Sequence, residues 1–297
     1  MSFSTDVKNE LCQIRVDTAA ELAECHGMLM LCRAFCFEKI LLHTGVLAVA
    51  EHFSALIRRS FGVITYIKKG GDKRPTYTVE VTSDADRKRI LHLLGYRRDH
   101  EIGVSLARLK SEGNIKAFIR GAFLAGATLS DPEKEYRCEF SFKDNNTAAD
   151  FLTLLDSQGL SFTMTFRAGK FLVYTKNSNT MEDLLTFLGA GGETLNLIGI
   201  KVYKSVRNKV NRKNNIETSN IMKTANAAFV QNNAIAKIKD SGKLELLPEE
   251  LYEAAILRLQ NPDLSLSALC KLSKMPITRS GLNHRIQKLI EIANDIK

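Results

Sequence analysis

An internal repeat constrains the fold of this chain more than any other feature of its sequence. Each half begins with an apolar segment that contains a glycine, Gly27 in the first half and Gly121 in the second. Each half ends with the dipeptide Leu-Gly, at Gly95 and at Gly189. Residue 121 lies 94 positions after residue 27, and residue 189 lies 94 positions after residue 95. The constant offset predicts that one structural unit occurs twice.

The elements predicted within the two repeats, at residues 18–96 and 113–190, follow the same order. After the apolar helix come a strand, a helix with apolar residues at three- and four-residue spacing, a hairpin and a closing helix. Ser83 and Thr180 are the predicted N-caps of the closing helices. In the first repeat the predicted strand is 42–50, the helix 52–60 and the hairpin 63–67 with 77–81, and a further strand is predicted near 33–38. In the second repeat the strand is 136–142, the helix 147–157 and the hairpin 162–166 with 171–174.

Composition and charge restrict the function. With 42 Lys and Arg against 33 Asp and Glu, the chain has a formal net charge of +9, and a basic chain attracts polyanions, most commonly nucleic acid. No apolar run near the N-terminus approaches the roughly 20 residues that cross a bilayer, so we expect no membrane partner. We also expect no signal peptide, because no basic leader precedes a long apolar stretch, and hence a cytoplasmic, nucleoid-associated protein.

The six cysteines are spread along the chain without a Cys-x-x-Cys pair, which is typical of reduced, mostly buried thiols. Cys32 and Cys36 lie one helical turn apart, with His26 and His43 nearby. Because structural zinc normally takes four ligands in compact spacing, we predict no metal site at these residues. No cofactor is predicted.

Beyond residue 192 the chain becomes basic and then rich in amides. Lys and Arg occur six times and acids are absent between 201 and 213, and a helix is predicted at 221–239. We therefore predict a platform at 1–192, basic and polar linker helices with a hinge at 193–244, and a third domain at 245–297. A solvated helix face and a secondary DNA contact both fit the basic stretch. The residues for such a contact are Arg207, Lys209, Arg212 and Lys213.

Residues 245–297 contain three predicted helices. Pro248, followed by two acids, opens the first helix, and Asn261-Pro262 stops it. Ser265 caps a short second helix, and after a tight break Thr278 caps the third. Three helices with a short turn before the last follow the order of a helix-turn-helix. A small helical bundle that contacts protein is the alternative.

The last predicted helix has one apolar and one polar side. Leu282, Ile286, Leu289 and Ala293 recur at steps of four, three and four residues, which predicts one buried stripe. The outward and flanking side chains can bond base edges and phosphates, and no acid occurs between residues 264 and 290. The predicted DNA contacts are Lys274, Thr278, Arg279, Ser280, Asn283, His284, Arg285, Gln287 and Lys288.

Three motifs in the same order resemble the WhiA family of sporulation regulators, and the resemblance covers nearly the whole chain. They are Arg120-Gly121-Ala122-Phe123-Leu124-Ala125-Gly126 with Thr128, residues 207–212 leading to 217–220, and residues 280–285. The N-terminal Met1-Ser2-Phe3-Ser4 also looks like that family's opening. The resemblance implies an α+β fold, with a duplicated LAGLIDADG homing-endonuclease-like domain followed by an all-α helix-turn-helix of the sigma-factor region-four kind. It also implies roles in sporulation gene control, or in cell division and chromosome segregation.

The resemblance also indicates where catalytic residues would lie on the two apolar helices. In LAGLIDADG nucleases each of these helices delivers a carboxylate that holds divalent metal at the scissile phosphates. The matching positions here are Cys32 and Gly126, and neither binds magnesium usefully. The nearest acids, Glu38 and Asp131, lie several residues beyond. We therefore predict a protein that is not an enzyme and has lost both catalytic acids.

In homing endonucleases a saddle of strands lies along the major groove, and the matching hairpins here are basic. They carry Lys68, Lys69, Lys73, Arg74, Arg167 and Lys170 as a further candidate contact with DNA, although protein or a small ligand is an alternative occupant of the saddle. The predicted function is a non-catalytic transcriptional regulator that binds double-stranded DNA, with other transcription or cell-division proteins as further candidate partners. An active LAGLIDADG-type nuclease and an RNA- or protein-binding scaffold are the alternatives.

Overall fold

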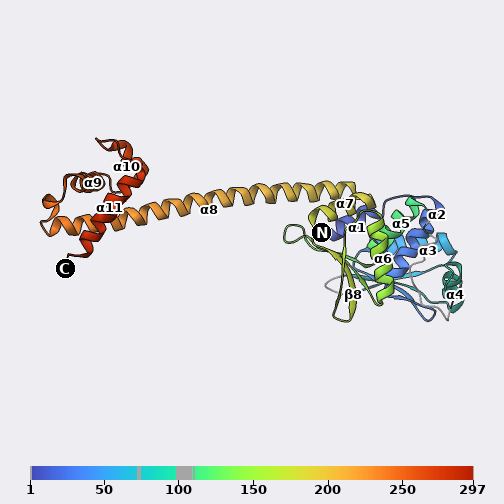
Figure 1. The fold of residues 1–297 in the computed structure, drawn as a ribbon. Coiled ribbons are helices and arrows are strands. Elements are labelled where there is room, and N and C mark those ends of the chain that lie inside the picture. The colour runs from blue at the N-terminus through green and yellow to red at the C-terminus, as the bar shows by residue number, and fades with distance from the viewer. Residues whose placement is uncertain (1, 72–74, 98–108, 110, 297) are drawn as a thin grey trace. The chain divides into compact units, whose positions relative to one another are not determined.

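The structure is a computed structural model that describes residues 2–71, 75–97, 109 and 111–296. The chain divides into two compact units, and the boundary between Lys204 and Ser205 falls inside α8 (Gly191–Asp240), a helix of 50 residues (Figure 1). One continuous helix thus covers most of 193–244, where separate linker helices and a hinge were predicted. The stretch contains no proline, so no residue in it removes a helical hydrogen bond.

Two four-stranded antiparallel sheets form the β-structure of the first unit, and their strands have the same order. The first sheet has the order β1-β2-β4-β3 and the second β5-β6-β8-β7. This agreement confirms the duplication predicted from the 94-residue offset, including the additional strand near residue 34. The strands are β1 (Ala34–Phe35), β2 (Ile40–Thr44), β3 (Tyr66–Gly70), β4 (Thr76–Val81), β5 (Ala127–Leu129), β6 (Cys138–Phe142), β7 (Thr163–Arg167) and β8 (Lys170–Thr175).

Helices of the first unit pack on these sheets and on each other (Figure 1). α3 packs against β2, β3 and β4, and α6 packs against β6, β7 and β8. The two glycine-containing helices, α2 and α5, form the most extensive helix contact of the unit. The helices are α1 (Phe3–Leu11), α2 (Thr18–Leu31), α3 (Leu47–Phe61), α4 (Asp84–Leu93), α5 (Glu112–Gly126), α6 (Asn145–Ser157) and α7 (Ser178–Leu188).

Gly27 and Gly121 allow α2 and α5 to approach closely. A Cβ atom on Gly27 would lie 2.0 Å from the carbonyl oxygen of Phe118, and one on Gly121 would lie 1.9 Å from that of Glu24. Residues 118 and 121 lie 94 positions after 24 and 27, so the two contacts are equivalent under the repeat. Only a residue without a side chain fits such a backbone contact, and the repeat supplies one on each helix.

Several predicted boundaries in the repeats are wrong. The hairpin strand predicted at 63–67 is β3, which begins and ends three residues later. The strand predicted at 42–50 ends at Thr44 in β2, and α3 begins at Leu47 rather than near His52. Val49 and Phe53 are both fully buried at a spacing of four, so the apolar residues after 46 belong to the helix period. Ser83 caps α4 as predicted, but α7 is capped by Asn177, whose side chain accepts from the backbone N–H of Asn179, and not by Thr180.

The second unit is a helical domain at the C-terminal end of the chain. It contains α8 from Ser205 onward, a short 3-10 helix (Leu244–Leu246), α9 (Glu249–Gln260), α10 (Leu266–Leu272) and α11 (Arg279–Asn294). Its core is formed by apolar residues from all of these elements, including Ile235, Ala255 and Leu269. The three predicted helices are confirmed, although Pro248 precedes α9 and is not its first residue. In the part of the chain that the structure describes, no helix is long and apolar enough to cross a membrane.

Candidate nucleic-acid interface

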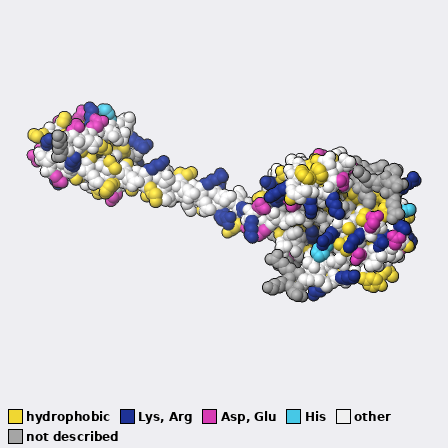
Figure 2. All heavy atoms as spheres, turned by 90° about the horizontal axis from the view of Figure 1, so that it is seen from below, with side chains coloured by type: hydrophobic (Ala, Val, Ile, Leu, Met, Phe, Trp, Pro, Cys, Tyr) yellow, Lys and Arg dark blue, Asp and Glu magenta, His cyan; other side chains and the backbone are white. Residues whose placement is uncertain are grey.

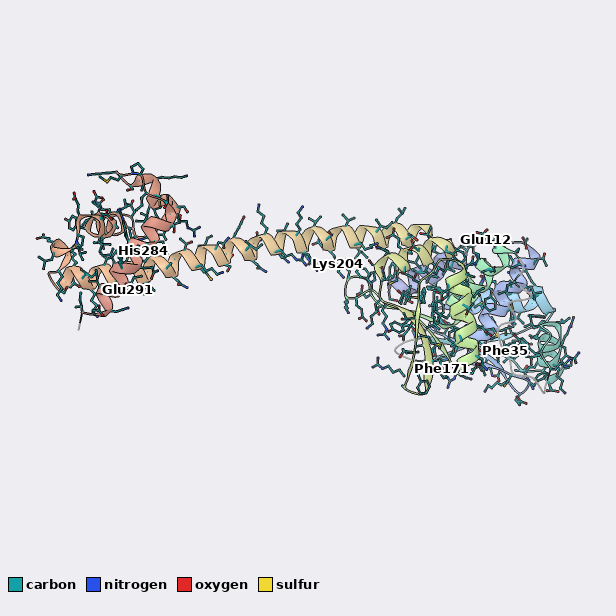
Figure 3. All side chains as sticks on the ribbon, viewed as in Figure 1. Phe35, Glu112, Phe171, Lys204, His284 and Glu291 are labelled. Carbon is teal, nitrogen blue, oxygen red and sulfur yellow. The ribbon has the colours of Figure 1, made fainter. Side chains whose placement is uncertain are left out.

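The last helix, α11, presents a polar side to solvent. The hydroxyl of Thr278 accepts from the backbone N–H of Gly281 and caps the helix, as predicted. Leu282, Ile286, Leu289 and Ala293 are buried, which confirms the predicted stripe. His284, labelled in Figure 3, is exposed, and at about 100° per residue it lies opposite this stripe on α11. The other exposed members of the predicted contact set are Lys274, Thr278, Arg279, Ser280, Asn283, Gln287 and Lys288.

Arg285 differs from the other predicted contacts because it has an acidic partner. Its guanidinium lies 3.0 Å from a carboxylate oxygen of Glu250 on α9, and its side chain is 25% exposed. Glu250 itself is 74% exposed, so solvent screens this pair and its contribution to stability is small. The Glu250 carboxylate still offsets the positive charge of Arg285 on α11.

A buried arginine fixes the loop between α9 and α10. Arg258 is 1% exposed, and its guanidinium donates to the carbonyl oxygens of Leu264 and Asn261 at 2.5 and 3.4 Å. Burial lowers the pKa of Arg258. Arg258 was not among the predicted site residues, although it lies four residues after Ala254, on the same face of the predicted helix. Arg258 therefore helps to place α10 ahead of the turn that leads into α11.

The basic residues of α8 divide into a packed group and an exposed group. Lys201 pairs with Glu182, and the Lys204 amine donates to the carbonyl oxygen of Pro132 at 3.1 Å and lies 4.6 Å from the centre of the Tyr136 ring (Figure 3). These two lysines serve the packing of the first unit. Every side chain from 205 to 223 is exposed, and Figure 2 shows dark-blue side chains along this helix. The exposed group includes the predicted contacts Arg207, Lys209, Arg212 and Lys213.

The predicted basic hairpins are exposed where the structure describes them. Lys68 and Lys69 lie on β3, and Lys68 pairs in register with Thr78, whose hydroxyl is 3.2 Å from His43 Nδ1. Arg167 and Lys170 flank a two-residue turn in which Ala168 and Gly169 have φ of 51° and 74°. Lys73 and Arg74, also predicted as contacts, lie outside the described residues.

The two positions aligned with catalytic acids line one cavity at the ends of α2 and α5. Cys32 is buried, its thiol donates to the carbonyl oxygen of Ala34 at 2.9 Å, and burial raises its pKa to about 12. Gly126 ends α5, and a Cβ there would lie 2.6 Å from Leu31 Cβ. Asp131, one of the nearest acids, accepts from the backbone N–H of Glu133 in its own turn.

The residues considered for zinc each have another hydrogen bond. His26 Nε2 lies 2.7 Å from the hydroxyl of Tyr96, and the Cys36 thiol donates to the carbonyl oxygen of Lys39 at 3.5 Å. Within the described ranges, no group of three or more His, Cys, Asp or Glu side chains could hold a metal ion. His26 and Cys36 also lie outside the described lining of the cavity, in which the helix ends carry no pair of carboxylates.

A buried ionic network that was not predicted joins α2, α3 and α5. The two carboxylate oxygens of Glu24 lie 2.8 Å from His52 Nε2 and 2.6 Å from an Arg120 guanidinium nitrogen, and both Glu24 and Arg120 are almost fully buried. Burial favours the neutral acid, but the hydrogen bonds and charges of His52 and Arg120 outweigh it, so the pKa of Glu24 is lowered. The sequence did contain a signal for this network, because Glu24 and Arg120 are charged residues inside largely apolar helices.

Known proteins resemble both parts of the chain. A family model for the WhiA LAGLIDADG-like domain matches residues 115–207, and one for the WhiA C-terminal HTH domain matches residues 210–293. The probable cell division protein WhiA of Thermoanaerobacter sp. (strain X514) is 36% identical over 313 residues, which span 100% of this chain and 98% of the relative. The protein of the same description from Clostridium acetobutylicum is 33% identical over 316 residues, with 100% and 99% covered.

Solved structures show the same fold. The crystal structure of full-length DUF199/WhiA from Thermatoga maritima matches with a TM-score of 0.59 at 22% identity, over 100% of this chain and 99% of that one. The N-terminal LAGLIDADG domain of DUF199/WhiA matches with a TM-score of 0.50 at 16% identity, over 63% and 92%. The duplicated sheets, the close helix pair and the terminal helical domain thus agree with the full-length sequence matches. This chain belongs to the WhiA family.

Proposed function

We propose that the protein is a non-catalytic transcriptional regulator that binds double-stranded DNA through α11. The observation that supports this most is the exposed polar side of α11, which lies opposite the buried stripe and carries amide, imidazole and basic side chains. Asn and Gln pair with adenine edges, and Arg and Lys pair with guanine or with phosphates. Because relatives are named probable cell division proteins, we place the regulated genes in cell division, and we add chromosome segregation and sporulation from the motifs that resemble the family. The proposed location is the cytoplasm, at the nucleoid.

The dependence of affinity on salt concentration distinguishes predicted contacts with phosphates from predicted contacts with base edges. Each phosphate contact adds about 0.9 to the slope of log affinity against log salt concentration. Lys288→Ala should therefore flatten this slope for every DNA sequence, whereas Asn283→Ala should leave the slope and relax the preference for the cognate site. Asn294→Ala, at the far end of α11, is the matched control and should change neither.

Gel shifts with the full chain, with duplex DNA and RNA of the same length, test the proposal. We expect duplex DNA to bind more tightly than RNA, and the α11 variants to change DNA affinity. Equal binding of RNA, together with unchanged affinity in Lys288→Ala and Arg279→Ala, would overturn the assignment of α11 as the recognition helix and favour a scaffold that recruits RNA or protein.

Basic residues on α8 and in the hairpins are the proposed secondary contacts. Arg207, Lys209 and Arg212 are exposed on α8, and contacts from such residues to phosphate carry no sequence information. An Arg212→Ala variant should lower affinity for cognate and random DNA by the same factor. Lys239→Ala, near the end of the same helix, is the control. A loss restricted to cognate DNA would show that α8 reads bases and would contradict this role.

We also propose that the protein does not cleave DNA, and the residues Cys32 and Gly126 support this. Neither supplies a carboxylate at the helix ends, where two-metal cleavage needs one from each helix. Supercoiled plasmid incubated with the protein and magnesium or manganese should remain supercoiled. Nicking that requires the metal and disappears in Asp131→Asn or Glu38→Gln would establish the nuclease alternative.

A further inference from the structure

The two repeats jointly line a cavity of about 770 Å³ at the C-terminal ends of α2 and α5. The first repeat contributes the end of α2 and parts of β1 and β2, and the second contributes the end of α5, part of β6 and the start of α6. All of these elements belong to the first unit. Cavities of roughly 300 to 1,000 Å³ are the usual size of sites for small molecules.

Positive side chains dominate the charged lining of this cavity. Arg33 comes from the first repeat, and Lys143 and Lys170 come from the second. No carboxylate pairs with any of these three among the residues that the structure describes. Asp144, the one acid among the described lining residues, caps α6 by accepting from the backbone N–H of Thr147 at 2.7 Å. The Lys143 amine donates to the Arg33 carbonyl oxygen at 3.2 Å, which places the two basic residues side by side.

Another part of the lining is apolar. Met30, Phe35 and Phe142 contribute to it, and Phe35 is half-buried on β1 with its ring 5.6 Å from that of Tyr96 (Figure 3). An inorganic anion would use the basic residues and leave this apolar surface uncovered. A ligand that joins a phosphate to a flat or apolar group would use both, because Arg and Lys bind phosphate oxygens and aromatic rings bind flat rings.

We propose that this cavity binds a small phosphate-bearing ligand of about mononucleotide size. The phosphate lies against Arg33, Lys143 and Lys170, and the flat or apolar part lies against Phe35 and Met30, which are only half-buried. A backbone phosphate of DNA is a weaker fit, because it remains joined to a sugar on both sides and brings no group for the apolar surface. The proposal does not depend on DNA recognition by α11.

Isothermal titration of the full chain in magnesium-free buffer tests this proposal. The probes are ADP, CDP, GDP and UDP, with inorganic pyrophosphate as the phosphate-only probe. We expect at least one nucleotide to bind about tenfold or more tightly than pyrophosphate. Arg33→Ala combined with Lys143→Ala should weaken both by about tenfold or more, since each removes a charge-assisted contact. Phe35→Ala should weaken the nucleotide and leave pyrophosphate unchanged.

Lys134→Ala is the matched control, because Lys134 is exposed in the same repeat and does not line the cavity. Thermal unfolding of each variant shows whether it keeps the fold, and a second pair, Lys143→Ala with Lys170→Ala, replaces any variant that does not. Absence of binding by all five probes would overturn the proposal. Nucleotide affinity that is the same in the control and in the cavity variants would also overturn it. A loss of DNA affinity in the cavity variants without nucleotide binding would assign the cavity to a backbone phosphate instead.

Discussion

A methyl group added at Gly121 should destabilise the first unit strongly. The Cβ of Gly121→Ala would lie 1.9 Å from the carbonyl oxygen of Glu24 and 3.0 Å from the backbone nitrogen of Met28. Backbone atoms cannot rotate away from this methyl, so α2 and α5 must separate by about 1 Å, which weakens the dispersion contacts along their whole interface.

The size of the effect follows from two opposing terms. Alanine is better than glycine inside a helix by about 1 kcal/mol, and overpacking a core costs about 1–3 kcal/mol or more. Because the clash is with backbone, we expect the upper end of that cost and a net loss of about 2 kcal/mol in the free energy of unfolding. For a domain of this size the midpoint of thermal unfolding should fall by about 4–8 °C.

Gly199→Ala is the matched control for this prediction. Gly199 is exposed in the helix interior of α8, and a Cβ there would meet no atom within 4 Å. This change should leave the midpoint unchanged or raise it by a few degrees, through the helix propensity of alanine. Thermal and urea unfolding followed by circular dichroism measure both variants. A Gly121→Ala protein as stable as the wild type would refute the close contact of α2 and α5.

Two further predictions concern charged pairs. Glu24→Gln should cost about 3 kcal/mol in the free energy of unfolding, because it leaves Arg120 buried beside a neutral amide. The folded-state pKa of Glu24 is lowered, so its contribution to the free energy of unfolding is complete above the unfolded pKa of about 4.3 and is lost as pH falls through the folded pKa. In urea unfolding, the free energy of unfolding of Glu24→Gln should therefore fall less steeply with acid pH than that of the wild type. Glu250→Gln should raise DNA affinity severalfold, and it should steepen the slope of log affinity against log salt concentration by up to about 0.9, because it releases Arg285 for a phosphate. Gel shifts at several salt concentrations measure the affinity and the slope. An unchanged slope would show that Arg285 does not contact DNA.

Hydrophobic periodicity and the constant 94-residue offset were sufficient to predict most of the fold. The 94-residue offset identified the pair Gly27 and Gly121, which makes equivalent backbone contacts in the structure. Period-3.6 spacing identified the buried stripe of α11, and Ser83, Ser265 and Thr278 were recognised as caps because a short hydroxyl side chain precedes each helix. The stripe and the caps depend on residues close in sequence, and the glycine pair on a pattern that the chain repeats, so a single sequence reveals them.

Features that depend on contacts between distant residues were not predictable in the same way. The strand and helix boundary after Thr44 was placed wrongly because apolar residues on both sides of it fit either period. The ion pair of Arg285 joins two helices whose distance apart the sequence does not give. The cavity at the ends of α2 and α5 needs both repeats in place, so its basic lining could not be recognised from Arg33 or Lys143 alone.

The buried network also shows where the repeat departs from symmetry. The residue 94 positions after Glu24 is Phe118, and the residue 94 positions before Arg120 is His26, so each charge occurs in one repeat only. A pairing of two α2 helices would bury two Glu24 carboxylates without a guanidinium, and a pairing of two α5 helices would bury two Arg120 side chains together. Leaving such a charge uncompensated costs several kcal/mol, whereas glycine contacts alone would permit either pairing. The glycines therefore bring the helices close, and the charges determine that α2 packs against α5.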